Sequence, residues 1–131
     1  MTTVEEPLAL AQAVVDYGHS DVLIVVDCLT LWLSNLLMPA QGGGCQQNQP
    51  ANLAKQAWVE PLLKAIENAP GPIVLVGNEI GLGVIPLGAE VRAFVDALGQ
   101  LNQAVAQACA RVTLMAAGLP LALKNSQEDR P

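Results

Sequence analysis

The chain has 131 residues, of which 52% are hydrophobic and only 14% are charged. This length suits one domain with a real core, and because aromatic residues make up only 3% of the chain, that core must be aliphatic. The net charge of −6, without a basic cluster, argues against nucleic acid and anionic lipid as partners.

The three cysteines are odd in number and widely spaced, with no Cys-x-x-Cys pair. A zinc site or a disulfide framework is therefore not expected, and a reducing cytoplasm is the natural setting. The sequence shows no signal peptide at its start and no apolar run of about 18 residues, so no membrane span is expected.

The first predicted elements are a helix, a strand and a second helix. Residues 5–17 predict a helix, with Thr3 as its cap and Glu5 in its first turn, where the helix dipole favours acids. The apolar run 22–26 predicts a strand buried on both faces, as in a parallel sheet covered by helices. Residues 29–38 predict a helix that is apolar around most of its circumference and hence deeply buried.

A loop and a long amphipathic helix come next. Residues 39–51 are rich in Gly and Gln and predict a mobile loop. Its three consecutive glycines do not follow a strand and have no Lys-Ser/Thr partner, so they do not form a phosphate loop. Residues 52–68 predict a helix that Pro61 can kink.

The last part of the chain alternates strands and helices again. Residues 73–76 predict a second buried strand, 89–110 the longest helix, and 111–116 and 119–123 two short strands. This order predicts an α/β fold with a mostly parallel sheet, in one domain over residues 1–124. The polar tail 125–131 is expected to fray.

Asp27 is the strongest candidate for a functional residue. It ends the first predicted strand, and open α/β sheets bind their ligands at the carboxyl ends of strands. An acid there can hold Mg²⁺, directly or through a water molecule. The alternative is structural, namely that Asp27 caps the helix that starts near Leu29.

Asn78 and Glu79 follow the second predicted strand in the same way, so their side chains should open on the same edge of the sheet as Asp27. Gly81 and Gly83 allow the backbone to approach a ligand or to adopt positive φ. The alternative is an ordinary glycine-rich turn between a strand and a helix.

Other polar residues are better explained by structure than by chemistry. Thr30, Ser34 and Asn35 are expected to satisfy buried polar groups, and His19, the only histidine, to be solvated. One histidine cannot build a Ser-His-Asp set or a histidine metal cluster.

Several motifs resemble the bifunctional adenosylcobinamide kinase / adenosylcobinamide-phosphate guanylyltransferase family. They lie at residues 26–37, 78–86 and 92–103, together with the segment Thr-Val-Glu-Glu-Pro at residues 3–7. The resemblance covers nearly the whole chain up to Lys124.

The resemblance implies a P-loop-NTPase-like fold, a homo-oligomer (a trimer in the family) and a role in cobalamin biosynthesis. Such enzymes phosphorylate adenosylcobinamide with ATP or GTP. They then transfer GMP from GTP through a histidine–GMP intermediate to give adenosylcobinamide-GDP. By this resemblance Glu5, Asp27, Asn78 and Glu79 are nucleotide-binding residues, with Mg²⁺ at Asp27.

The chain departs from the family pattern at two places. The family's N-terminal strand and Gly-rich Lys-Ser loop, and the histidine that accepts GMP, have no counterpart in these 131 residues. The chain therefore reads as the C-terminal two-thirds of such an enzyme, holds no catalytic residue of its own, and is expected to be inactive alone. Two alternatives are a non-catalytic interaction domain that kept the fold and a P-loop ATPase of another kind.

Overall fold

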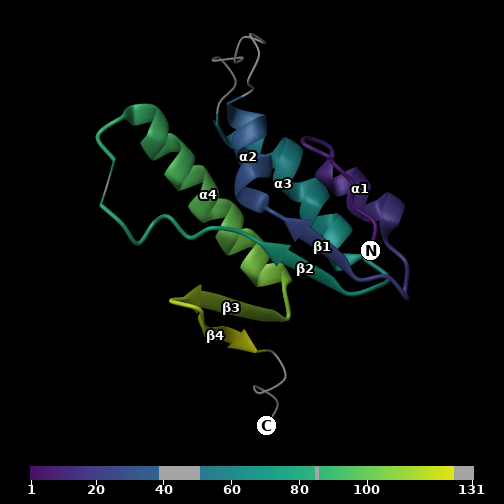
Figure 1. Cartoon of the computed structure of the whole chain (residues 1–131). Coiled ribbons are helices and arrows are strands. Elements are labelled where there is room, and N and C mark those ends of the chain that lie inside the picture. The colour runs from purple at the N-terminus through teal and green to yellow at the C-terminus, as the bar shows by residue number, and fades with distance from the viewer. Residues whose placement is uncertain (39–50, 85, 126–131) are drawn as a thin grey trace.

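The computed structural model describes residues 1–38, 51–84 and 86–125. In chain order the elements are α1(Leu10–Tyr17), β1(Ile24–Asp27), α2(Leu29–Leu37), α3(Ala51–Glu67), β2(Ile73–Val76), α4(Ala89–Ala108), β3(Arg111–Ala116) and β4(Leu119–Asn125) (Figure 1). The predicted order of helices and strands is confirmed. The loop expected at 39–51 lies outside the described residues except for Ala51, which begins α3, and the tail does so from residue 126.

The prediction of a helix over residues 5–17 is wrong at its start, because α1 begins only at Leu10. The Glu6 carboxylate accepts hydrogen bonds from the backbone N–H groups of Leu8 (3.0 Å) and Ala9 (2.7 Å). These bonds hold residues 6–9 in a turn ahead of the helix. Glu5 therefore lies outside the helix, in an exposed N-terminal segment.

The strands form two separate pairs among the described residues. Strands β1 and β2 are parallel, with Ile24 opposite Ile73 and Asp27 opposite Val76, whereas β3 and β4 form an antiparallel hairpin. The expectation of a mostly parallel sheet is therefore only half right. The residues around Gly118 turn the chain between β3 and β4, and the positive φ of Gly118 (76°) suits a residue without Cβ.

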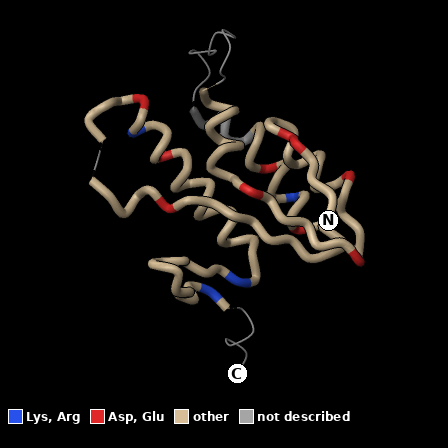
Figure 2. Tube along the Cα trace, in the orientation of Figure 1, with Lys and Arg blue, Asp and Glu red and all other residues tan. Residues whose placement is uncertain are grey.

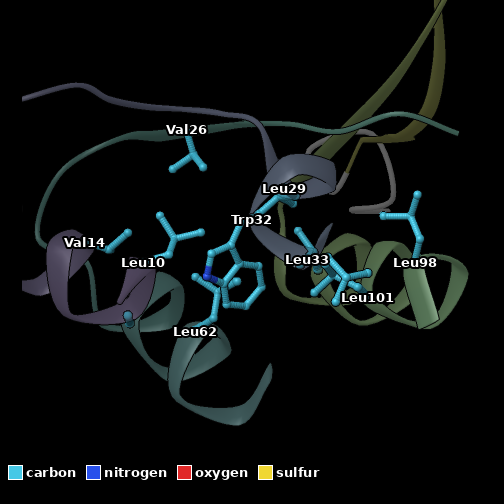
Figure 3. Close-up of a cluster of buried hydrophobic side chains, with 11 residues drawn as sticks. Leu10, Val14, Val26, Leu29, Trp32, Leu33, Leu62, Leu98 and Leu101 are labelled. Atoms are coloured by element: carbon cyan, nitrogen blue, oxygen red, sulfur yellow. The ribbon is translucent and has the colours of Figure 1, made fainter. Parts of the chain in front are cut away.

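The core lies on one side of the β1–β2 pair. Trp32 of α2 lies among side chains from the other helices, and the strands pass along one side of this cluster (Figure 3). The core residues, all below 9% exposed, are Leu10, Val14, Val26, Leu29, Trp32, Leu33, Leu62, Ala65, Leu98, Leu101 and Val105. A fully buried leucine such as Leu62 contributes about 1.5–3 kcal/mol through the hydrophobic effect.

The prediction that β1 and β2 are buried on both faces is wrong. Val26 and Leu75 point into the core, but Val25 is 57% exposed and Val74 is 47% exposed on the other face. Because side chains alternate along a strand, one whole face of this sheet is open. Helix α2 is likewise not buried all round, since Leu31 is exposed while Leu29, Trp32 and Leu33 are buried.

The N-terminal segment is fastened to α2 by two polar side chains. The indole Nε1–H of Trp32 donates to the Leu8 carbonyl (2.9 Å), and the Asn35 amide donates to the Pro7 carbonyl (3.3 Å). Asn35 thus satisfies a backbone group, but in an exposed bond and not a buried one as expected from the sequence. These bonds bring the segment that holds Glu5 alongside the helix that follows Asp27.

Candidate functional site at the carboxyl ends of β1 and β2

Asp27 and the Asn78–Glu79 pair meet at one edge of the parallel sheet. Asp27 is the last residue of β1 and lies opposite Val76, the last residue of β2, so the segment from Gly77 to Glu79 begins beside it. The expectation that these strand ends share one edge is confirmed. In open α/β folds this edge is the usual ligand position.

Asp27 does not cap the helix that follows it. The N-cap of α2 is Cys28, whose Sγ accepts a hydrogen bond from the Leu31 N–H at 3.5 Å. The Asp27 side chain is exposed, and no described residue donates a hydrogen bond to it. The structural alternative for Asp27 thus loses its basis, and its carboxylate is available to a ligand.

The backbone of Asn78 is held on both sides by side chains from two helices. Its N–H donates to the Thr30 hydroxyl oxygen at 2.9 Å, and its carbonyl accepts from the Asn102 amide at 3.1 Å. Thr30 belongs to α2 and Asn102 to α4, so both helices fix the start of this loop. The Asn78 side chain makes neither of these bonds and is exposed at the sheet edge.

Glu79 takes part in the local structure of its own loop. One carboxylate oxygen accepts a hydrogen bond from the Gly81 N–H at 2.8 Å, and a Cβ at Gly81 would lie only 2.9 Å from the same oxygen. A side chain at position 81 would therefore push this flexible carboxylate aside, whereas glycine leaves room for it. The other oxygen of Glu79 remains available to a ligand.

The loop after Glu79 exposes several apolar side chains. Leu82 and Val84 are almost fully exposed, as is Leu87 near the start of α4. Arg92 of α4 donates hydrogen bonds to the carbonyls of Pro86 and Leu87, which fastens the far end of the loop to the helix. The Arg92 guanidinium is thus engaged with backbone oxygens.

The charges of the site match a cation and not a bare anion. Asp27 and Glu79 lie at the sheet edge, whereas Arg111 and Lys124 lie on the β3–β4 hairpin (Figure 2). Lys124 donates to the carbonyls of Ala106 and Gln107 at the end of α4. In the described part of the chain, no three acidic, histidine or cysteine side chains gather as a metal cluster.

This donor set fits Mg²⁺ only together with phosphates and water. Mg²⁺ keeps several waters and is often bound through one or two carboxylates plus substrate phosphates. The exposed Asp27 carboxylate, unoccupied by any described donor, fits that requirement. Asp27 would hold the ion, and the ion would neutralise phosphate charge.

Two other sequence-based candidates belong to different segments of the chain. Glu5 precedes α1, and His19 is exposed in the turn after it. A hollow of about 530 Å³ lies between α1 and the end of α3, lined by residues such as Val14, Lys64 and Asn68. It includes none of the strand-end candidates, so the site is an open edge and not this hollow.

Sequence reasoning recognised the groups at the strand ends but not the residues that hold them. Thr30 was expected to satisfy a buried polar group; it does accept a hydrogen bond, but from the Asn78 N–H and in an exposed position. Asn102 appeared only as part of a resemblance. The position of Thr30 in the sequence could have identified its role. A polar residue in the first helical turn after one strand lies close to the end of the neighbouring strand.

Comparison with known proteins extends over nearly the whole chain. Residues 1–123 match the family described as cobinamide kinase / cobinamide phosphate guanyltransferase. The chain belongs to this family. No helix in the described ranges has the length and apolar character needed to cross a membrane.

Two curated relatives show how much of the family's length is present. The bifunctional adenosylcobalamin biosynthesis protein CobP of Pseudomonas aeruginosa is 46% identical over 123 residues, which are 94% of this chain and 65% of the relative. CobU of Escherichia coli, with the same description, is 30% identical over 113 residues, which are 81% of this chain and 62% of the relative. The chain thus spans less than two-thirds of the curated relatives it matches.

Proposed function

We propose that this chain provides the acidic edge of the nucleotide site in an enzyme of cobalamin biosynthesis. The enzyme phosphorylates adenosylcobinamide with ATP or GTP and then transfers GMP from GTP, giving adenosylcobinamide-GDP. The observation that carries the proposal is the juxtaposition of Asp27 with Asn78 and Glu79 at the carboxyl ends of two parallel strands. Family membership supports the reaction, because the family's description names both activities.

In this proposal Asp27 holds Mg²⁺, directly or through water, and Asn78 and Glu79 contact the nucleotide. Glu5 is a further nucleotide contact. For this contact, the N-terminal segment that is hydrogen-bonded to α2 must approach the same nucleotide. The fold is of the P-loop type, with β1 and β2 as two of its parallel strands. Thr30 and Asn102 act indirectly, because they fix the backbone of Asn78.

The phosphate-binding loop and the histidine that accepts GMP have no counterpart among these 131 residues. Without a nest of backbone N–H groups and a lysine, the phosphate charge is uncompensated, and without the histidine the covalent step has no nucleophile. We therefore assign both to the family's remaining third. The complete enzyme is cytoplasmic and forms a homo-oligomer, a trimer as in the family. Light scattering of the complete enzyme measures this oligomeric state.

The test is an assay of adenosylcobinamide-GDP formation from adenosylcobinamide and GTP with Mg²⁺. One sample holds this chain alone, and the other holds a fusion in which the unmatched part of P. aeruginosa CobP precedes residue 1. We expect activity only from the fusion. A folded fusion without kinase or guanylyltransferase activity would contradict the function, and phosphorylation by the chain alone would contradict the division of roles.

A further inference from the structure

The segment that follows the strand-end carboxylates carries a row of exposed aliphatic side chains. Ile80 is 41% exposed, Leu82 81%, Val84 97% and Leu87 98%, and these four residues are here called the apolar loop. None of them belongs to the buried core, so they contribute little to the stability of the fold. Contiguous exposed apolar side chains commonly mark a surface that binds a ligand or a partner.

Both ends of this loop are fixed by hydrogen bonds. At its start the Glu79 carboxylate accepts from the Gly81 N–H at 2.8 Å, and at its end Arg92 donates to the carbonyls of Pro86 and Leu87. In Figure 1 the described parts of the loop run outward from the end of β2 and return to the start of α4. A segment held at both ends loses less conformational freedom when it binds, which favours a role in ligand contact.

The apolar loop begins at the candidate site itself. Ile80 directly follows Glu79, and Val84 is five residues beyond Glu79. Because an extended chain spans about 3.3–3.6 Å per residue, Val84 lies within about 18 Å of Glu79. A ligand that contacts both therefore has its reacting end at the carboxylates and a large apolar body beside them.

The charges around the loop favour a ligand whose body is not negatively charged. Asp27 and Glu79 lie at the sheet edge where the loop begins, and residues 80–88 include no charged side chain. An apolar molecule that carries carboxylates would be repelled by these two acids. The corrinoid ring of adenosylcobinamide has methyl and neutral amide groups at its edge, so it fits both the apolar side chains and the charges.

We propose that the apolar loop binds the corrinoid ring of the acceptor substrate, while the acceptor's hydroxyl lies at the nucleotide phosphates near Asp27 and Glu79. This inference rests on the proposed function, because that function provides the acceptor. Leu82, Val84 and Leu87 pack against the methyl groups of the ring. They determine how tightly the acceptor binds and have no part in binding the nucleotide.

A second copy of this chain is a poorer occupant of the apolar loop. Four aliphatic side chains bury far less than the roughly 800 Å² that each partner of a stable interface covers. Each copy also carries a net charge of −6, which opposes close self-association. An oligomer must therefore draw most of its contact area from other surfaces.

The first test is steady-state kinetics of the fusion in which the unmatched part of P. aeruginosa CobP precedes residue 1. The double variant Leu82→Ser, Val84→Ser should raise the KM for adenosylcobinamide at least about tenfold, because it removes aliphatic contact with the ring. Its kcat and its Kd for Mg–GTP should not change, since these side chains do not contact the nucleotide. An unchanged KM, or an equal rise in the Kd for Mg–GTP, would overturn the proposal.

Val15→Ser is the matched control, because Val15 is an aliphatic residue of α1 that is 60% exposed. We expect it to leave the KM for adenosylcobinamide unchanged. A rise equal to that of the double variant would show that any loss of exposed aliphatic surface has this effect, which would contradict a site at the apolar loop. Circular dichroism checks that each variant is folded, and Leu87→Ser replaces a double variant that is not.

The second test does not depend on catalysis. Adenosylcobinamide is added, without nucleotide, to the 131-residue chain with isotope-labelled leucine and valine methyl groups. We expect the NMR signals of the Leu82, Val84 and Leu87 methyl groups to shift and those of Val15 to stay in place. No shift, or shifts confined to other residues, would overturn the proposal.

Together the two tests separate this inference from the proposed function. If the folded fusion is inactive, the proposed function fails, and the methyl signals alone decide whether the loop binds the ring. If the fusion is active but the methyl signals of the loop do not respond, the function stands and the inference fails. Shifts of the same signals that appear when the chain is concentrated without ligand would make a second copy the occupant, which also overturns the proposal.

Discussion

The hydroxyl oxygen of Thr30 accepts a hydrogen bond from the backbone N–H of Asn78, 48 residues further along the chain, at 2.9 Å. This bond joins the helix that follows β1 to the loop that follows β2. It keeps the Asn78–Glu79 segment next to Asp27, and Asn102 holds the carbonyl of the same residue. The geometry of the candidate site therefore depends on residues that do not themselves have to touch a ligand.

Replacing Thr30 with Val should release the Asn78 amide while nearly preserving side-chain shape. We expect the free energy of unfolding to fall by about 1 kcal/mol at most, because the bond is exposed. Hydrogen exchange at the Asn78 amide should become faster. Thr30→Ser keeps the acceptor and serves as the control. Equal Asn78 exchange rates in the two variants would show that the bond does not hold this loop.

Two glycines should respond differently to the same added methyl group. A Cβ at Gly71 would overlap the carbonyl oxygen of His19 and lie 2.7 Å from that of Val22, whereas a Cβ at Gly77 would lie 3.5 Å from Asn102 Oδ1. Gly71→Ala should therefore cost about 1–3 kcal/mol, because the backbone must shift. Gly77→Ala should change stability by about 0.5 kcal/mol or less. Urea unfolding of both variants measures the difference, and similar losses would contradict the assignment.

The indole of Trp32 should contribute through its N–H as well as its packing. Trp32→Phe keeps an aromatic ring in the core but removes the bond to the Leu8 carbonyl, which should cost about 1 kcal/mol plus the packing loss. The N-terminal segment should then become more sensitive to protease. Trp58→Phe, on α3, is the control, and equal protease sensitivity of the two variants would argue against this attachment.

The Glu6 carboxylate should titrate below the usual range for glutamate. Hydrogen bonds from the backbone of Ala9 and then of Leu8 lower the pKa of Glu6 from its ordinary value of 4.5. Because the folded-state pKa is depressed, this stabilisation is present above the unfolded pKa and is lost as pH falls through the folded pKa. NMR titration of the side-chain carboxyl carbon should give a midpoint below 4.5. A midpoint at or above it would contradict these bonds.

The stability difference between the native chain and Glu6→Gln should follow the same pH dependence. We expect it to be constant above about pH 5 and to shrink as pH falls below the unfolded pKa. A difference that grows on acidification would show that the charge of Glu6 is not what the turn requires.

The sequence was sufficient to predict the elements whose patterns are local. Strand β2 and the helix after Asp27 were predicted closely because apolar runs and their polar ends set them. The start of α1 was not predicted correctly. Thr3 and Glu5 suggested a first helical turn, but the Glu6 carboxylate instead binds the backbone N–H groups of Leu8 and Ala9 in a turn ahead of the helix. Side-chain capping favours either structure, and the sequence pattern alone does not decide between them.

Burial of the strands could not be predicted from their composition alone. An unbroken apolar run such as residues 22–26 is typical of a strand covered on both faces, yet Val25 is exposed. What covers a sheet depends on chain that packs against it from elsewhere. The roles of Thr30 and Asn102 were hidden for the same reason, because their partner at Asn78 is distant in sequence.

The central claim, that the acid closing β1 belongs to a Mg–nucleotide site, is tested most directly by calorimetric titration of GTP with Mg²⁺. The protein is the fusion of the unmatched part of the P. aeruginosa relative to residues 1–131, and the variants are Asp27→Asn and Asp21→Asn. Asp21 is exposed and precedes β1, so it controls for the loss of one charge. We predict that Asp27→Asn weakens Mg–GTP binding at least about tenfold and that Asp21→Asn does not. Equal affinity in the two variants would contradict the account.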